Sequence, residues 1–194
     1  MEKVELSPIG LIPVRPILLV GANVNGKPDF MEVGAGGPVS NDPPMIALPI
    51  RHQRYTLKGM LENRTLSINV PMVNLAKEAD YCGIVSGADA DKVKNCHFEI
   101  FYGKLKTAPM IKQCAINLEC TLFHTLSTTS HVIVIGQIHA TYISGEYLKD
   151  GKPDFDKLNP LLWFEGKAEY VGFGNSFGKS RSIGQQIADL TLKK

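Results

Sequence analysis

The sequence has few of the features that mark several large classes of protein. No apolar run approaches the roughly 18 residues that a membrane-spanning helix needs. Four cysteines in 194 residues are too few and too scattered for a disulfide framework. The formal net charge is only +2, whereas a general nucleic-acid binder usually has a marked basic excess. We therefore expect no membrane segment, no disulfides and no nucleic-acid partner.

Several short signatures are also missing. The opening residues, MEKVELSPIG, include acids and lack the apolar core of a signal peptide, which together with the lack of a membrane-spanning run predicts a cytoplasmic protein. Neither G-x-S-x-G nor a phosphate-binding glycine fingerprint is present. Cys96 and His97 are adjacent, as some metal ligands are, but no second pair follows. We expect buried thiols and no metal site.

The patterns that are present indicate one mainly β domain over residues 1–194. Helical spacing of apolar residues is seen at 55–63 and 74–85, and a capping pattern opens a further helix at Ser182. About six segments have the apolar content of strands; they are 17–24, 45–50, 65–70, 116–126, 131–143 and 168–174. Because regular helices do not separate these segments, an antiparallel barrel is favoured over a doubly wound parallel sheet.

Three local features refine this picture. Asn25-Gly26 is a typical two-residue hairpin turn. Pro49 lies inside an apolar run, which predicts an edge or a bulge because proline has no backbone N–H. Gly136 interrupts the longest strand and predicts a bulge or a bend.

A basic cluster follows the apolar run 45–50. Arg51 and Arg54 stand at the strand end, and Thr56 is placed to cap the helix that begins there. A hydroxyl, guanidinium groups and free N–H groups at a helix start together form an anion site. The alternative is a solvated basic turn without a ligand.

Other features have two interpretations each. The glycines of 34–37 allow close approach of a flat ligand, or simply a tight loop. Ser86-Gly87, Asp89 and Asp91-Lys92 indicate a turn with a helix cap. Lys92 is either a second anion partner or a solvated lysine. His131 is either a proton donor to a ligand or a structural histidine. Late aromatic residues either stack on an aromatic ligand or pack in a core or a dimer; they are Trp163, Phe164, Tyr170 and Phe173.

In this order and spacing, the segments resemble the flavin reductase-like family, with an FMN-binding split barrel, and within it the flavoredoxin and archaeal ferric reductase branch. The proline-led strand with R-x-T is matched by Arg54-Tyr55-Thr56, and the following N-V-P by Asn69-Val70-Pro71. The other matching segments are YCGIVSGADADK, LECTLFHTLSTTSHVIVIGQI and NPLLWFEGKAEYVGFG.

The resemblance implies an antiparallel split β-barrel of Greek-key type with a few short helices, which forms a homodimer with one FMN per subunit. It places the flavin ring along 31–37 and the phosphate near Arg54 and Thr56. His131 is the candidate catalytic residue. The candidate cofactor-binding residues are Met31, Glu32, Val33, Gly34, Ala35, Gly36, Ser40, Arg54, Thr56, Asn69, Ser86, Gly87 and Lys92.

One stretch departs from the family pattern. Where relatives have N-x-M-T-x-S, this chain has Asp29, Glu32 and Gly34 in place of the asparagine, threonine and serine. Hydroxyl contacts to the flavin are then lost. A charged Glu32 beside a reduced flavin anion would be electrostatically unfavourable.

The resemblance implies an oxidoreductase that passes reducing equivalents from NADH or NADPH through FMN to free flavin, ferric iron or a protein acceptor. Two alternatives stay open. One is an FMN-holding electron carrier without nicotinamide activity, and the other is a non-catalytic dimeric binding module with a decayed flavin site.

Overall fold

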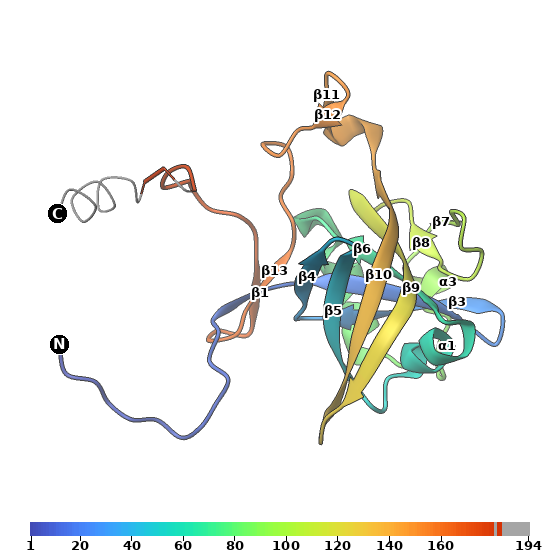
Figure 1. Ribbon diagram of the computed structural model, residues 1–194, viewed down its shortest axis with the longest axis horizontal. Helices are drawn as coiled ribbons and strands as arrows, with labels where there is room; N and C mark the ends of the chain where they lie inside the picture. The colour runs from blue at the N-terminus through green and yellow to red at the C-terminus, as the bar shows by residue number, and fades with distance from the viewer. Residues whose placement is uncertain (181, 184–194) are drawn as a thin grey trace.

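The centre of the molecule is a seven-stranded antiparallel sheet (Figure 1). The computed structural model describes residues 1–180 and 182–183, so the helix predicted from Ser182 lies outside the described residues except for its first two. The sheet order is β3-β2-β6-β9-β10-β5-β4. Its strands are β2 (Leu18–Val24), β3 (Lys27–Val33), β4 (Gly37–Asn41), β5 (Pro44–Arg51), β6 (Thr65–Val70), β9 (Ile116–Ser127) and β10 (His131–Ile143).

Smaller elements surround this sheet. The α-helices are α1 (Tyr55–Asn63), α2 (Ala76–Ile84) and α3 (Lys92–Asn95), with 3₁₀ turns at Val73–Leu75 and Gly145–Tyr147. A second sheet joins β1 (Val14–Pro16), β13 (Leu162–Phe164) and β14 (Glu169–Val171). Two short hairpins pair β7 (Ile100–Phe101) with β8 (Met110–Ile111), and β11 (Leu148–Lys149) with β12 (Lys152–Pro153).

The predicted mainly β, antiparallel class is confirmed, whereas closure of the sheet into a barrel stays a prediction. β3 and β4 are the edges of the ladder, and within residues 1–180 they do not pair with each other. None of the described helices has the length and apolar content to cross a membrane.

Local backbone features follow the turn chemistry of the sequence. Asn25 and Gly26 have φ values of 51° and 74°, as the two-residue turn between β2 and β3 requires. The β9–β10 register shifts between Ile135 and Gly136, so the irregularity predicted at Gly136 is confirmed, with Phe123 of the partner strand β9 as the additional residue. Pro49 lies in an interior strand, but the β4 ladder ends at Ala47. No β4 residue lies opposite Pro49, so the lack of an N–H at Pro49 leaves no β4 carbonyl without a partner. The strand is locally an edge at this position.

The two faces of the sheet at β2 and β3 pack against separate apolar clusters. Leu18 and Val20 point into the cluster that includes Met60 of α1, whereas Leu19 points into the cluster that includes Cys82 of α2. Cys114 and Cys120 are also buried, and burial raises the pKa of Cys120 to about 12. These thiols are therefore neutral and poorly reactive, as the sequence predicted for buried cysteines.

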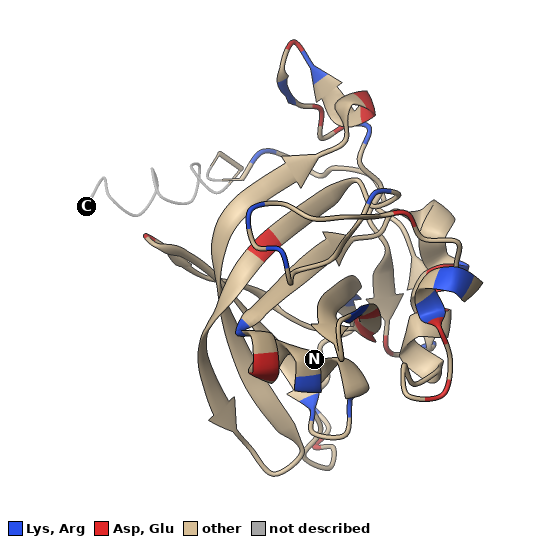
Figure 2. Ribbon diagram, turned by 90° about the vertical axis from the view of Figure 1, so that its right-hand side faces the viewer, with Lys and Arg blue, Asp and Glu red and all other residues tan. Residues whose placement is uncertain are grey.

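Charged residues are few along the strands of the sheet (Figure 2). The edge strand β3 is an exception, because it carries both Asp29 and Glu32. Asp29 is buried and Glu32 is half-buried. A carboxylate in such a position needs partners, and these partners define the functional site described below.

The contact between α1 and β2 depends on a glycine. A Cβ atom at Gly59 would collide with the backbone carbonyl of Asn23, which cannot move away as a side chain can. We expect Gly59→Ala to lower the free energy of unfolding by about 1–3 kcal/mol, despite the better helix propensity of alanine. Chemical denaturation checks this, with Gly145→Ala as the control because nothing lies within 4 Å of its Cβ position. Equal stability of the two variants would contradict the close packing of α1 on β2.

Candidate functional site

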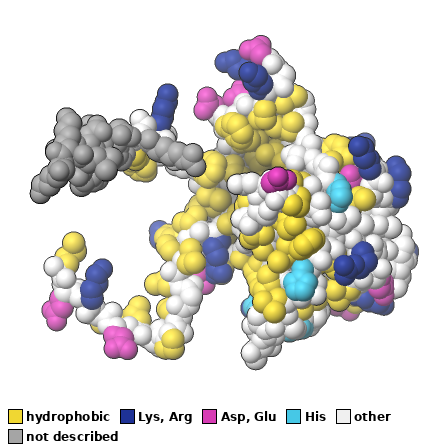
Figure 3. Space-filling model, viewed as in Figure 1, with side chains coloured by type: hydrophobic (Ala, Val, Ile, Leu, Met, Phe, Trp, Pro, Cys, Tyr) yellow, Lys and Arg dark blue, Asp and Glu magenta, His cyan; other side chains and the backbone are white. Residues whose placement is uncertain are grey.

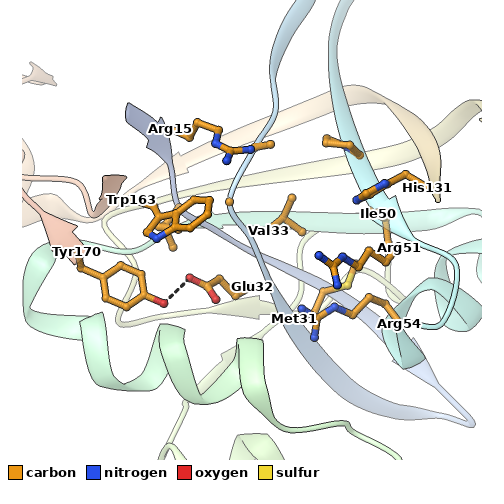
Figure 4. Close-up of a pocket in the computed structure, with 14 residues that line it drawn as sticks. Arg15, Met31, Glu32, Val33, Ile50, Arg51, Arg54, His131, Trp163 and Tyr170 are labelled. Carbon is orange, nitrogen blue, oxygen red and sulfur yellow. Dashed lines mark hydrogen bonds between the residues drawn. The ribbon is translucent and has the colours of Figure 1, made fainter. Parts of the chain in front are cut away.

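A cavity of about 560 Å³, here called the main cavity, lies between the large sheet and the three-stranded sheet (Figure 4). β3 and the loop after it form one wall, with Met31, Glu32, Val33, Gly34 and Ala35. The end of β5 and the start of β10 form a second wall. The small sheet closes a third side. Segments far apart in the sequence thus meet around one space.

A second hollow of about 290 Å³, the side cavity, shares Met31, Arg51 and Arg54 with the main cavity. Its other walls come from the start of α1 and from the loop between α2 and α3. The two guanidinium groups therefore stand at the junction of the two spaces. An elongated ligand with an anionic end fits such an arrangement.

The structure brings most of the predicted site residues to these two cavities. The main cavity is lined by Met31, Glu32, Val33, Gly34, Ala35, Arg54 and His131. The side cavity is lined by Arg54, Thr56, Ser86, Gly87 and Lys92. Gly36, Ser40 and Asn69 line neither one.

Arg54 is fixed by the helices on both sides of the cavity junction. It is the N-cap residue of α1, and its Nη1 donates a hydrogen bond to the Gly83 carbonyl of α2 at 2.7 Å. The prediction that Thr56 caps this helix is wrong, since α1 has no side-chain cap. The Thr56 hydroxyl is buried and donates instead to Asp29 Oδ2 at 2.5 Å.

The Lys92 side chain is not solvated, and its charge is already paired with a carboxylate. Its side chain is 2% exposed, and its Nζ lies 3.2 Å from Asp29 Oδ1. A side chain at Gly87 would collide with the same carboxylate. The predicted capping of the next helix is confirmed, because Asp91 Oδ1 accepts a hydrogen bond from the Lys94 N–H at 2.9 Å. Asp29, at a position where the family resemblance implied an asparagine, thus supplies the counter-charge for Lys92.

Asn69 lies in the protein interior, away from both cavities. Its Nδ2 donates to the Leu19 carbonyl at 2.8 Å, and its Oδ1 accepts from the Ile111 N–H at 2.9 Å and from Asn117 Nδ2 at 2.7 Å. This network assigns Asn69 a structural role. Gly36 is likewise explained by packing, because its φ is 128° and a Cβ there would lie 2.7 Å from a Leu48 methyl carbon.

The carboxyl group of Glu32 faces two other elements, β14 and α2. Tyr170 of β14 donates a hydrogen bond to its Oε1 at 2.8 Å, and a side chain at Gly83 of α2 would collide with it. Burial raises the pKa of Glu32, and repulsion by Asp80 adds to this effect. The hydrogen bond from Tyr170 and the charge of Arg54 act in the opposite direction.

The raised pKa of Glu32 has a consequence for stability. A carboxyl group that binds its proton more tightly in the folded protein makes stability fall as pH rises from the ordinary value of 4.5 through the raised pKa. We expect Glu32→Gln to remove this decline, so that its stability relative to wild type increases with pH. Urea unfolding between pH 4 and pH 8 measures this, with the exposed neighbour Glu169→Gln as a control. A constant difference between wild type and Glu32→Gln would contradict the raised pKa.

The site also contains residues that the sequence patterns missed. Arg15 of β1 reaches the main cavity, where its guanidinium lies 4.7 Å from the Trp163 ring centre and pairs with Glu165 at 2.5 Å. Ile17, Pro49 and Ile50 complete the lining. Trp163 and Tyr170 were predicted either to meet a ligand or to pack, and both line the cavity.

Residues 13–172 match the family model described as "Flavin reductase like domain", so the chain belongs to the flavin reductase-like family. Its fold is similar to that of flavoredoxin from Methanosarcina acetivorans, with 39% identity, a TM-score of 0.91 and coverage of 96% of this chain and 100% of that one. Flavoredoxin of Desulfovibrio vulgaris (Miyazaki F) is 28% identical, with a TM-score of 0.86 and coverage of 94% and 100%. An uncharacterized protein from Archaeoglobus fulgidus is 33% identical over 147 residues, which are 75% of this chain and 81% of that one. The family resemblance seen in the sequence is thereby confirmed.

Proposed function

We propose that this protein is an FMN-binding oxidoreductase whose cofactor occupies the main cavity and the junction with the side cavity. The observation that carries this proposal is the placement of Arg51 and Arg54 at the junction of the two cavities. FMN has a phosphate, which the two guanidinium groups can bind, and a flat aromatic ring, which can lie beside Trp163. The similarity to two flavoredoxins supports the same cofactor.

The chain's own residues would hold the cofactor in a defined way. Ala35, Pro49 and Trp163 are half-buried and offer apolar surface to the ring. Gly34 leaves its backbone accessible. Arg51, Arg54 and the Ser86 hydroxyl would bind the phosphate. Lys92 contributes less, because Asp29 already neutralises it.

FMN, when bound, supplies the chemistry of accepting a hydride and passing on electrons. The protein's task is then to bind, orient and shield. His131 stands opposite Arg51 in the β5–β10 register and lines the main cavity, where it can donate a hydrogen bond to a ligand. Its Nδ1 lies 2.7 Å from the Ser130 hydroxyl, which constrains the ring.

We also infer NADH or NADPH as the electron source, free flavin, ferric iron or a protein as the acceptor, a split-barrel closure and a homodimer. Apolar side chains lie along the face of the sheet shown in Figure 3. Val39 of β4, together with Phe123 and Leu126 of β9, is exposed. A second copy of the chain that covered such residues would bury apolar surface.

The cofactor proposal is tested by adding FMN to the purified protein and then, without oxygen, NADH or NADPH. We expect saturable binding of one FMN per chain and bleaching of its visible bands by one of the nicotinamides. Bound FMN that neither nicotinamide reduces would instead support the electron carrier. A chain that takes up no FMN would support the non-catalytic module.

The phosphate end is tested by Arg54→Ala. We expect the loss of a charge-assisted contact to weaken FMN binding by about 1–3 kcal/mol, a roughly 5- to 150-fold rise in Kd measured by flavin fluorescence quenching. Lys58→Ala is the control, since this exposed lysine of the same helix only pairs with Glu62 at 3.9 Å. An unchanged Kd in Arg54→Ala would remove Arg54 from the site.

A further inference from the structure

The phenol group of Tyr170 lies between two carboxyl groups. Its oxygen is 2.8 Å from Glu32 Oε1 and 2.9 Å from Asp80 Oδ1. A phenol has one proton and can donate only one hydrogen bond, whereas an ionised carboxylate can only accept. If both carboxylates were ionised, one of these contacts would join two oxygens with no proton between them. The geometry therefore accommodates one additional proton.

The surroundings favour Glu32 as a holder of this proton. Glu32 lies on β3 with its carboxyl group against Gly83, and the negative Asp80 is on the other side of the phenol. Burial and both hydrogen bonds also raise the pKa of Tyr170, so the phenol keeps its own proton. One extra proton then lets Glu32 donate to Tyr170 while Tyr170 donates to Asp80.

Nearby cations do not form a competing ion pair with Glu32. Arg54 is the charged group that lowers the Glu32 pKa, but its Nη1 is bonded to the Gly83 carbonyl. Arg15 lines the same cavity and is paired with Glu165. Arg51 and His131 also face this space, at the end of β5 and the start of β10. No ion pair within 4 Å involves Glu32 in the described part of the chain.

We propose that Glu32, Tyr170 and Asp80 share one extra proton at neutral pH, and that the protonated Glu32 carboxyl group is a positioning residue in the wall of the FMN site. The part of this proposal that concerns FMN rests on the proposed function. The shared proton follows from the contacts of the three side chains and does not depend on the ligand. A neutral Glu32 removes the negative charge that would otherwise face the ligand in this wall. The replacement of the family's threonine by Glu32 is thereby compatible with a flavin in the cavity.

Ligand binding and protonation are then coupled. A ring that covers the main cavity removes water from Glu32, which disfavours its charged form still further. Binding should take up a proton at any pH where Glu32 is partly ionised. FMN affinity should accordingly fall by up to tenfold per pH unit above the pKa of Glu32.

The first test uses the protein without ligand. Carboxyl carbons of isotopically labelled glutamate are titrated by NMR, and the Glu32 signal is identified by its loss in Glu32→Gln. We expect Glu32 to titrate well above the ordinary glutamate value of 4.5. Asp80→Asn should lower that pKa, and the control Glu169→Gln should leave it unchanged. A wild-type Glu32 carboxyl group that is already ionised at neutral pH would overturn the shared proton.

The second test measures proton uptake on FMN binding by calorimetry in two buffers of different ionisation enthalpy. Wild type should take up more protons than Glu32→Gln, and Glu32→Gln should have the flatter dependence of Kd on pH. The ionisation of the FMN phosphate is common to both proteins and cancels in the comparison. Equal uptake would overturn the positioning role of Glu32. Failure of both proteins to bind FMN would instead contradict the proposed function and the positioning role, and the NMR titration would still decide the shared proton.

Discussion

Asp29→Ala is expected to lower the free energy of unfolding by about 3–5 kcal/mol, as happens when one partner of a buried ion pair is removed. The Lys92 ammonium and the Asp29 carboxylate lie 3.2 Å apart, and their side chains are 2% and 7% exposed. Without Asp29, the lysine charge stays buried with no compensating anion. The buried Thr56 hydroxyl also loses its acceptor.

The chain offers a matched control for this experiment. Lys112 and Glu99 are also 3.2 Å apart, but their side chains are 57% and 68% exposed. Glu99→Ala should therefore cost only about 0–1 kcal/mol. Asp29→Asn should lie between the two, because it keeps an acceptor for Thr56 and loses only the charge. Urea denaturation of the three variants measures the series, and an Asp29→Ala loss no larger than that of Glu99→Ala would contradict the buried pair.

The Asp29–Lys92 ion pair changes the interpretation of the stretch from Asp29 to Gly34. From the sequence, this stretch predicted lost flavin contacts and an unfavourable charge. Asp29 lines neither the main nor the side cavity and instead compensates Lys92. Glu32 does line the main cavity, with Tyr170 and Asp80 as its partners. The two acidic substitutions therefore have different consequences.

Elements with uninterrupted periodicity were predicted with the correct bounds. The helix 55–63 and the strands 65–70 and 131–143 match α1, β6 and β10. Strand β3 was not predicted, because its charges at Lys27, Asp29 and Glu32 hide the pattern of an element that is half-covered by α2 and α3. The short strand β1 exists only through its pairing with the distant β13, and local sequence does not encode that pairing.

The same limit applies to the site. The site residues within 31–35 and 51–56 were predicted from the sequence, because each group belongs to one contiguous motif. Arg15 contributes through the pairing of β1 with β13, which places it opposite Trp163. The Glu32–Tyr170 contact spans 138 residues of sequence. A partner at such a distance becomes visible only in the folded chain.

The sequence patterns also did not predict that the polar face of β6 and β9 is buried. Alternation along β6 and β9 predicts one apolar face and leaves Ser67, Asn69, Asn117 and Glu119 on the other. All four are buried. The segment from Lys104 to Ile111 covers them and uses their polar atoms: Glu119 accepts from the Leu105 N–H at 2.7 Å, and the Ser67 hydroxyl donates to the Pro109 carbonyl. These side chains replace the water that a solvated face would have.

Asn69→Leu should consequently lower the free energy of unfolding by about 2–6 kcal/mol. The substitution leaves the Leu19 carbonyl and the Ile111 N–H without their partner in the interior, at about 1–3 kcal/mol for each buried group. Asn117 loses an acceptor as well. Asn74→Leu is the control, because Asn74 is exposed and its replacement should change stability by only about 0.5 kcal/mol or less.

The same variant separates a structural role of Asn69 from the cofactor role that the family resemblance implied. Since Asn69 lines neither cavity, the folded fraction of Asn69→Leu should bind FMN with the wild-type Kd in a titration at low temperature without denaturant. A large loss of stability with unchanged Kd assigns Asn69 to the interior network. Wild-type stability with a raised Kd would reverse that assignment and bring Asn69 into the flavin site.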